Sequence, residues 1–324
     1  MKKIRFLAAV LSLSLLFSFA GCTGSQKPGD DTLRVVASIF PPYDFARQIG
    51  GDHISLTMLL RPGTESHSYE PTAADMIALE NCDSLLCAGG EGEQWVQTLL
   101  SAVSNPDITV IRMMDCVPLV EESSDGIAGN GHENHGHSHE EDLFEEEHGE
   151  YDEHVWASPV NAGLICDAFC NAFCRQDPEN AGFYQENLRV YRKELSEVDA
   201  LFREVVSSGA RKEIVVGDRF PFRYLAEEYG LRYAAAFPGC ASDTGASASS
   251  VAALIEEVRR QKIPVVFHIE FSNHRIADAI CEETGASLLQ LHSCHNLSAE
   301  DFAAGVTYTQ IMRQNAENLR LALG

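Results

Sequence analysis

The chain is poor in basic residues, and this shortage excludes some functional classes of protein. Its 324 residues include 24 Lys and Arg against 48 Asp and Glu, which gives a formal net charge of −24. A protein that binds nucleic acid needs a basic surface to meet the phosphates, so the composition excludes nucleic acid as a partner. An acidic surface suits a soluble protein that attracts cations, although such a surface also serves solubility alone.

Long apolar runs are also scarce, and the clearest one lies at the start of the chain. Lys2, Lys3 and Arg5 give the chain a short basic start, and the stretch from Ile4 to Ala20 is otherwise almost wholly apolar or Ser. It is shorter than a comfortable membrane span and ends in small residues, as a secretory signal does. Its end, Phe19-Ala20-Gly21-Cys22, resembles the processing site of bacterial lipoproteins, with Cys22 as the lipidated residue. An uncleaved anchor is the alternative.

We therefore expect a signal peptide at residues 1–21 and a flexible polar tether at 22–31. The mature protein would be extracytoplasmic and held to the cell membrane by its lipid, at the periplasmic face or the cell surface. Three of the basic residues lie in the signal, so the mature chain keeps 21 against 48 acidic ones.

The remaining chain of about 300 residues is long enough for two lobes. Short apolar, partly β-branched runs alternate with helical patterns in both halves, which predicts mostly parallel sheets flanked by helices. The expected strands are 33–40, 56–60, 84–88 and 108–112 in the first half, and 213–216, 232–237, 264–269 and 287–291 in the second.

One long helix is predicted between the halves. Asp177-Pro178 provides a helix start, and apolar residues recur at gaps of three and four from Tyr184 to Val205. The fold class expected is therefore α/β, with two lobes at 32–175 and 209–324 joined by one rigid helix within 176–208. A helix packed inside a single domain is the alternative.

The segment 121–150 differs in composition from the rest of the chain. Residues 121–153 hold thirteen acidic residues and no Lys or Arg, and they include His132, His135, His137 and His139. Without an apolar pattern to bury, the segment is expected to be a mobile loop. Imidazoles at this density are expected to bind zinc, copper or nickel loosely and reversibly, and an acidic loop whose histidines are incidental is the alternative.

Metal-capable side chains follow several predicted strands. Parallel α/β sheets bind ligands at the carboxyl ends of their strands, where His67, Asp218 and His292 fall, and His154 precedes a helix start. Two of these four come from each half, so a cleft between the lobes would bring them together. Asp218 could instead cap the following helix. Glu270, at another strand end, is expected to orient a ligating imidazole rather than to bind the metal.

Several motifs resemble those of the zinc- and manganese-binding proteins of bacterial ABC importers. They are Pro62-Gly63 with His67-Ser-Tyr-Glu-Pro71, Asp152-Glu-His154-Val-Trp156-Ala-Ser-Pro159, Tyr224-Leu225 with Tyr229-Gly-Leu231, and Tyr308 with Met312-Arg313, Asn315 and Leu319. The histidine-rich segment stands just before the second motif, as in zinc-type members. The resemblance covers residue 32 to the end. It implies two α/β lobes, one buried metal between them, and delivery of that metal to a membrane permease with its ATPase.

Two positions depart from the family pattern. The third ligand is usually His or Glu, and Asp218 stands there. The fourth is usually Asp, where this chain has Leu291-His-Ser-Cys-His295. The alignment favours His292, and Cys294 or His295 could serve instead after a small shift of the loop.

The set His67, His154, Asp218 and His292 offers three imidazoles and one carboxylate. Zn2+ accepts such a tetrahedral shell, whereas Mn2+ prefers more oxygen and is therefore less favoured. A closed shell leaves no position for an activated water, which indicates binding rather than catalysis, by a protein expected to be a monomer.

Two other functions remain as alternatives. A zinc hydrolase would need a bound water with Glu65 or Glu270 as base, but the sequence has no His-Glu-x-x-His pair and no nucleophile motif. A zinc store or chaperone would work through the histidine-rich segment alone.

Overall fold

The computed structural model describes residues 32–64, 69–123, 126–128, 151–239 and 247–324. The chain divides between Thr32 and Leu33, and the helices and strands named below belong to the unit Leu33–Gly324. Within the described ranges, no helix combines the length and the apolar character that crossing a membrane requires.

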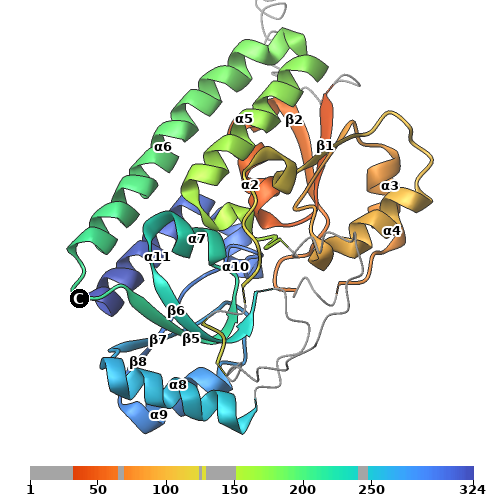
Figure 1. The fold of residues 1–324 in the computed structure, drawn as a ribbon. Helices are drawn as coiled ribbons and strands as arrows, with labels where there is room; N and C mark the ends of the chain where they lie inside the picture. Colours follow the sequence, from red (N-terminus) through yellow and green to blue (C-terminus); the bar gives the residue numbers. More distant parts are fainter. Residues whose placement is uncertain (1–31, 65–68, 124–125, 129–150, 240–246) are drawn as a thin grey trace, which may run out of the picture. The chain divides into compact units, whose positions relative to one another are not determined.

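Two four-stranded parallel sheets form the framework (Figure 1). The first has the order β2-β1-β3-β4 and the second β6-β5-β7-β8. The strands of the first are β1 (Leu33–Ala37), β2 (Ile54–Met58), β3 (Ser84–Cys87) and β4 (Thr109–Arg112), and those of the second are β5 (Glu213–Phe220), β6 (Arg232–Pro238), β7 (Val265–His268) and β8 (Ser287–Gln290). All eight predicted strands are present, with boundaries shifted by a few residues.

Helices cover both faces of each sheet. They are α2 (Phe40–Gly50), α3 (Ala73–Glu80), α4 (Gln94–Ala102), α5 (Pro159–Gln176), α6 (Ala181–Ser208), α7 (Arg223–Tyr229), α8 (Ala248–Gln261), α9 (Arg275–Thr284), α10 (Ala299–Ala303) and α11 (Tyr308–Leu323). One apolar cluster packs α3 and α4 on the first sheet, another packs α8 and α9 on the second, and the largest runs through the facing sides of both sheets. The predicted fold class is confirmed.

The 28-residue helix α6 contacts helices from both halves: α2 and α5 from the first, α7 and α11 from the second. Its start matches the predicted signal, because the side chain of Asp177 accepts a hydrogen bond from the backbone N–H of Asn180 in the preceding 3-10 turn. Its buried face includes Tyr184, Tyr191, Leu195, Val198, Phe202 and Val205. The apolar period of this helix therefore serves to bind the two halves together.

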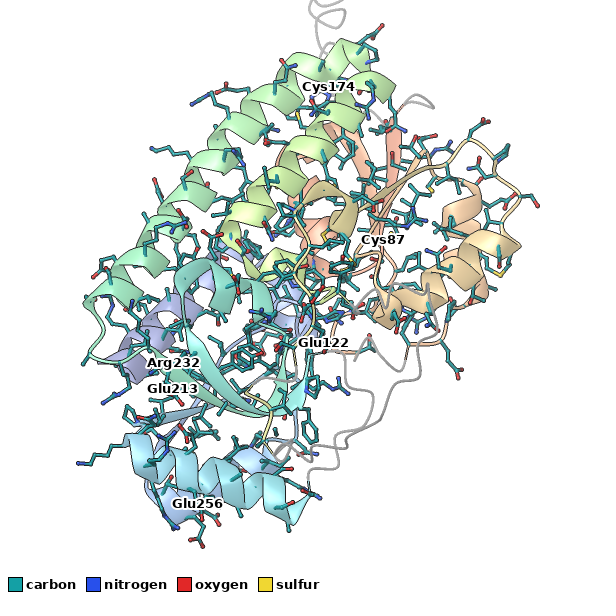
Figure 2. The ribbon with its side chains drawn as sticks, in the orientation of Figure 1. Cys87, Glu122, Cys174, Glu213, Arg232 and Glu256 are labelled. Carbon is teal, nitrogen blue, oxygen red and sulfur yellow. The ribbon has the colours of Figure 1, made fainter. Side chains whose placement is uncertain are left out.

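Strand β5 contains an irregularity that the sequence pattern did not indicate. It pairs with β6 from Glu213↔Arg232 onward, and Figure 2 shows these two side chains together at the start of the strands. The register then shifts between Val216 and Arg219. Such a bulge adds a residue to one strand and redirects the side chains around it, here that of Asp218, which follows Gly217.

We predict that helix α6 stabilises the protein mainly through the side chains of its buried face. Val198→Ala removes two buried methyl groups and should lower the free energy of unfolding by about 2 kcal/mol in urea titrations. Val190→Ala is the matched control on the same helix, because Val190 is 46% exposed, and it should change stability by no more than about 0.5 kcal/mol. Equal effects of the two substitutions would contradict this packing.

Candidate metal-binding site

A cavity of about 390 Å³ lies at the carboxyl ends of strands from the second sheet. Asp218 reaches it from β5 and Glu270 from the segment after β7, and these two strands flank the point where the strand order of the sheet reverses. Open parallel sheets bind ligands at such points. Of the described residues in the first half of the chain, Thr64 and His154 line the cavity, so it is a cleft between the halves.

His154 is held in place by a neighbouring carboxylate. It directly precedes a short 3-10 turn at Val155–Ala157, which leads into α5. Its Nδ1 lies 3.1 Å from Oδ1 of Asp152, and both side chains are buried. A carboxylate on one ring nitrogen fixes the imidazole and strengthens the other nitrogen as a metal ligand.

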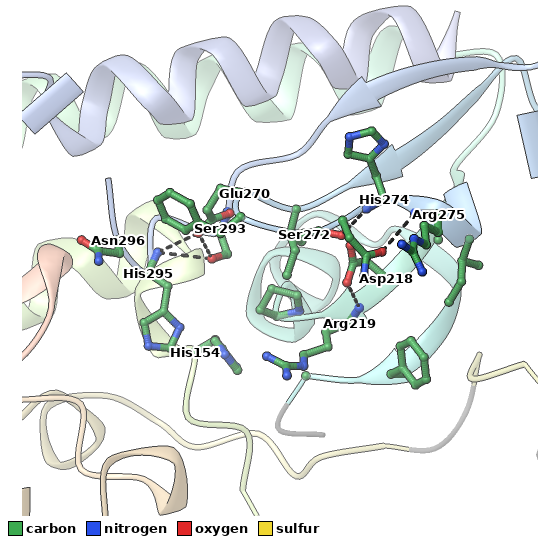
Figure 3. A pocket seen from close by; sticks show the side chains of 18 of the residues that line it. His154, Asp218, Arg219, Glu270, Ser272, His274, Arg275, Ser293, His295 and Asn296 are labelled. Atoms are coloured by element: carbon green, nitrogen blue, oxygen red, sulfur yellow. Dashed lines mark hydrogen bonds between the residues drawn. The ribbon is translucent and has the colours of Figure 1, made fainter. Parts of the chain in front are cut away.

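His295 provides the second imidazole. Its ring centroid lies 5.7 Å from that of His154 and 5.2 Å from that of Trp156. Figure 3 shows His154 and His295 together at one end of the cavity. The indole N–H of Trp156 donates to the carbonyl of Ser293 at 2.9 Å, so the first half of the chain also holds the turn that carries His295.

The carboxylate of Glu270 fixes this turn by hydrogen bonds. It accepts them from the backbone N–H and the hydroxyl of Ser293 and, at 3.3 Å, from the backbone N–H of His295. The side chain is buried, and these donors satisfy its charge. Glu270 thus acts on the position of His295 through the backbone.

His292 does not line this cavity. It lines a second cavity of about 250 Å³ beside α11, where Asn315 accepts from its backbone N–H and donates to its carbonyl. Its Nδ1 accepts from the backbone N–H of Cys294 at 2.9 Å. The left-handed φ of 63° at Cys294 turns the chain between the two histidines. His295 is consequently the histidine of this turn that lines the cavity with His154.

Cys294 is poorly suited to bind a metal. It is 1% exposed, and burial, with the negative charge of Glu270 second, raises the pKa of its thiol well above the usual value. Metals bind the thiolate, which this environment disfavours.

Asp218 occupies a different part of the same cavity. In Figure 3 it lies with His274 and Arg275, at the end away from His154 and His295. Among the described residues, no three His, Cys, Asp or Glu side chains group in a way that could hold a metal. The expected ligand His67, the loop histidines His132, His135, His137 and His139, and Cys22 all lie outside the described residues.

Asn296 connects the histidine end of the cavity to the first half of the chain. Its side-chain amide donates to the carbonyls of Arg61 and Thr64, each at 2.8 Å, and the backbone N–H of Gly63 donates to the carbonyl of Leu297. Residues 61–64 lead toward His67 in sequence. Sequence reasoning missed Asn296, although its place next to the His-Ser-Cys-His segment was a usable signal.

Two further carboxylates, those of Glu93 and Glu153, are buried in the first half of the chain. Glu93 accepts from the backbone N–H groups of Ala88 at 2.6 Å and Gly89 at 3.3 Å, beyond the end of β3. Glu153, next to His154, accepts from the N–H of Gly92 at 2.8 Å. Burial, and to a smaller extent the charge of Glu153, raise the pKa of Glu93 to about 7 against the opposing effect of its hydrogen-bond donors.

Comparison with known proteins relates the chain to metal-binding transport components. A protein family described as ZnuA, the periplasmic component A of zinc-uptake complexes, matches residues 35–322. The zinc-binding lipoprotein AdcA of Streptococcus pneumoniae R6 is 30% identical over 320 residues, which are 99% of this chain. The chain spans 61% of the length of that relative. The high-affinity zinc uptake system protein ZnuA of Bacillus subtilis is 28% identical over 99% of this chain and 98% of that protein.

Solved structures give the same relation. The Zn(II)-bound ZnuA-like domain of S. pneumoniae AdcA superposes with a TM-score of 0.72 at 26% identity, covering 90% of this chain and 99% of that one. The metal-dependent lipoprotein YcdH of B. subtilis superposes with a TM-score of 0.72 at 27% identity over the same shares. A Mn-bound periplasmic metal-binding protein from Candidatus Liberibacter asiaticus, at 23% identity and a TM-score of 0.73, shares the fold.

The burial of Glu93 predicts a pH dependence of stability. Its pKa rises on folding from the ordinary 4.5 to about 7, so between these values the native state holds a proton that the unfolded state has released. The free energy of unfolding should therefore fall as pH rises through this window, by up to about 1.4 kcal/mol per pH unit from this residue.

Urea titrations at pH 5.5 and 7.5 measure this contribution. Glu93→Gln should lose less stability over the interval than the wild type. Glu91→Gln, an exposed neighbour in the same 3-10 turn, should behave as the wild type does. An unchanged pH dependence in Glu93→Gln would refute the assignment.

Proposed function

We propose that this chain, which belongs to the ZnuA family of periplasmic zinc-uptake components, captures Zn2+ outside the cytoplasm and delivers it to the membrane permease of an ABC importer. The observation that carries the proposal is the pair of imidazoles, His154 and His295, brought together in the cleft between two α/β lobes. The zinc-binding names of the relatives AdcA and ZnuA support the choice of cargo.

The ligand set we propose is His154, His295 and His67, of which the geometry supports the first two and the sequence alone supplies the third. Zn2+ binds imidazole readily, and a buried Asp152 behind His154 is the partner that ligating histidines commonly have. His295 takes the place that sequence alignment gave to His292, since His292 faces another cavity. Asn296 supports the inclusion of His67, because it ties the turn of His295 to Thr64, three residues before His67.

The chemistry of this set also bears on the choice of metal. Imidazole nitrogens suit zinc better than manganese, which prefers oxygen ligands such as carboxylates and water. The carboxylates nearest the two imidazoles are engaged elsewhere, Asp152 with a ring nitrogen and Glu270 with backbone donors. Zn2+ is therefore the cargo, and Mn2+ would bind more weakly.

The proposal includes the setting of the protein. Lipidation at Cys22 would hold it by a tether to the outer face of the cell membrane, and a permease with its ATPase would accept the metal. The protein would act as a binding component without catalytic activity, in accord with its family.

Substitution of the two histidines of one turn tests the ligand set. His295→Ala should lower zinc affinity by about 100-fold or more, beyond the 10–100-fold expected when only a supporting contact is lost. His292→Ala is the matched control and should leave the affinity within about threefold, because its ring lies outside the cleft. Competitive titration against a chromophoric chelator gives both values. Loss of affinity in His292→Ala with retention in His295→Ala would overturn the assignment.

Removal of residues 129–150 separates transport from storage. A transport component keeps one tight zinc site after this deletion, since His154 and His295 lie outside it, whereas a store that works through the histidine-rich segment loses its tight site. Zinc analysis after gel filtration of the intact and shortened proteins gives the stoichiometry. Complete loss of tightly held zinc on deletion would favour the store.

A further inference from the structure

Two further histidines come together at the carboxyl end of β7. His268 is the last residue of that strand, and His274 is the residue directly before α9. Their ring centroids lie 5.2 Å apart, with the ring planes inclined by 48°. Two imidazoles that share one tetrahedral zinc ion, with Zn–N bonds of about 2 Å, have their centroids roughly 5 Å apart. The pair therefore has the spacing of two ligands of one ion.

Hydrogen bonds determine which nitrogen of each ring is available to a metal. Nδ1 of His268 lies 2.9 Å from the carbonyl oxygen of Ile269, which can only accept, so this nitrogen carries the proton. Nδ1 of His274 donates in the same way to Oδ2 of Asp278 at 2.8 Å, one turn further along α9. The lone pair of each neutral ring is consequently on Nε2. Neither Nε2 has a hydrogen-bond partner among the described residues.

This construction repeats that of the first histidine pair. Asp152 holds Nδ1 of His154 as Asp278 holds Nδ1 of His274, and such a carboxylate orients the ring and strengthens its other nitrogen as a ligand. The two pairs differ in their access to solvent, because the side chain of His154 is 1% exposed and that of His274 is 45% exposed. An ion at the second pair would therefore exchange more readily with solvent.

The turn between β7 and α9 fixes the place of His274. Phe271 and His274 both have a left-handed φ, 57° and 40°, which residues with a side chain seldom adopt. The hydroxyl of Ser272 accepts from the backbone N–H of His274 at 2.9 Å. The ring thus stands against the end of β7 because of the backbone and Asp278, and it is not a freely rotating surface side chain.

We infer that His268 and His274 form a second zinc site, weaker than the first, beside the far end of the cleft. His274 also lines the cleft, at the end away from His154 and His295 (Figure 3). Within the part of the chain that the structure describes, no third His, Cys, Asp or Glu completes a metal-binding group with the pair, so water fills the remaining positions. The choice of zinc rests on the proposed function, whereas the pairing of the two imidazoles does not.

Nuclear magnetic resonance of the mature protein, labelled with 15N in its histidines, tests this site. Two-bond proton–nitrogen correlations resolve both ring nitrogens of each histidine, and substitution variants assign the signals. Zinc itself is the probe. The first equivalent should shift the signals of His154 and His295. Further zinc should shift Nε2 of His268 and Nε2 of His274 together, at one common zinc concentration.

Substitutions on either side of the pair sharpen the test. His268→Gln should raise the zinc concentration at which His274 responds by about tenfold or more, because one of two protein ligands is lost. Asp278→Asn keeps both ligands and should weaken their response by about 10- to 100-fold, as loss of a carboxylate behind a ligating imidazole does. His53→Gln is the control in the first half of the chain, where His53 packs on Phe183 at 4.2 Å, and it should match the wild type.

The contrary outcomes are distinct. Responses of His268 and His274 at unrelated zinc concentrations, or an unchanged response of His274 in His268→Gln, overturn the inference by showing two separate histidines. Further zinc that shifts neither ring overturns it as well, because the ion is then held elsewhere. Wild-type signals of His154 and His295 in each variant show that the fold is intact.

Failure of the proposed function is seen separately, as a first zinc equivalent that leaves the signals of His154 and His295 unchanged. A shared response of His268 and His274 would still support the second site in that case.

Discussion

The arrangement of the cleft depends on one buried carboxylate, that of Glu270. It stands just beyond β7, where the strand order of the second sheet reverses, and it gathers three donors from the turn at residues 293–295. A buried charge in this position is stable only while its hydrogen bonds are made. The same bonds determine which residue of the turn enters the cleft. The hydrogen bonds that stabilise this buried charge therefore also select a side chain that lines the cleft.

The first half of the chain repeats this arrangement with different residues. Glu93 sits beyond β3, beside the reversal point of the first sheet, and holds the backbone of Ala88 and Gly89. In both halves a carboxylate thus organises the loop that follows a central strand, and neither carboxylate is left to face the cavity with its full charge.

The sequence predicts the framework well because apolar periodicity is a local property. All eight strands and the long helix followed from runs of a few residues, and the Pro-bounded motif singled out His154, which lines the cleft. The details of the cleft depended on backbone geometry that no local pattern records. The left-handed φ at Cys294 turns the chain so that His295, and not His292, lines the cavity. The register shift in β5 places Asp218 away from the imidazoles. Both features displace the pattern of side chains by a few residues, and in a turn or a strand such a displacement changes which side chains face the cavity.

The links made by Asn296 and Trp156 restrict how the cleft can exchange its contents. Asn296 bonds to two carbonyls of the first half and Trp156 to a carbonyl of the second, and Tyr308 in turn donates to the carbonyl of Trp156 at 2.7 Å. Any hinge-like parting of the sheets must break several of these bonds at once. Under the proposed function, these links would slow the escape of zinc from the cleft, and a permease that offers alternative partners to these few groups would set the timing of release.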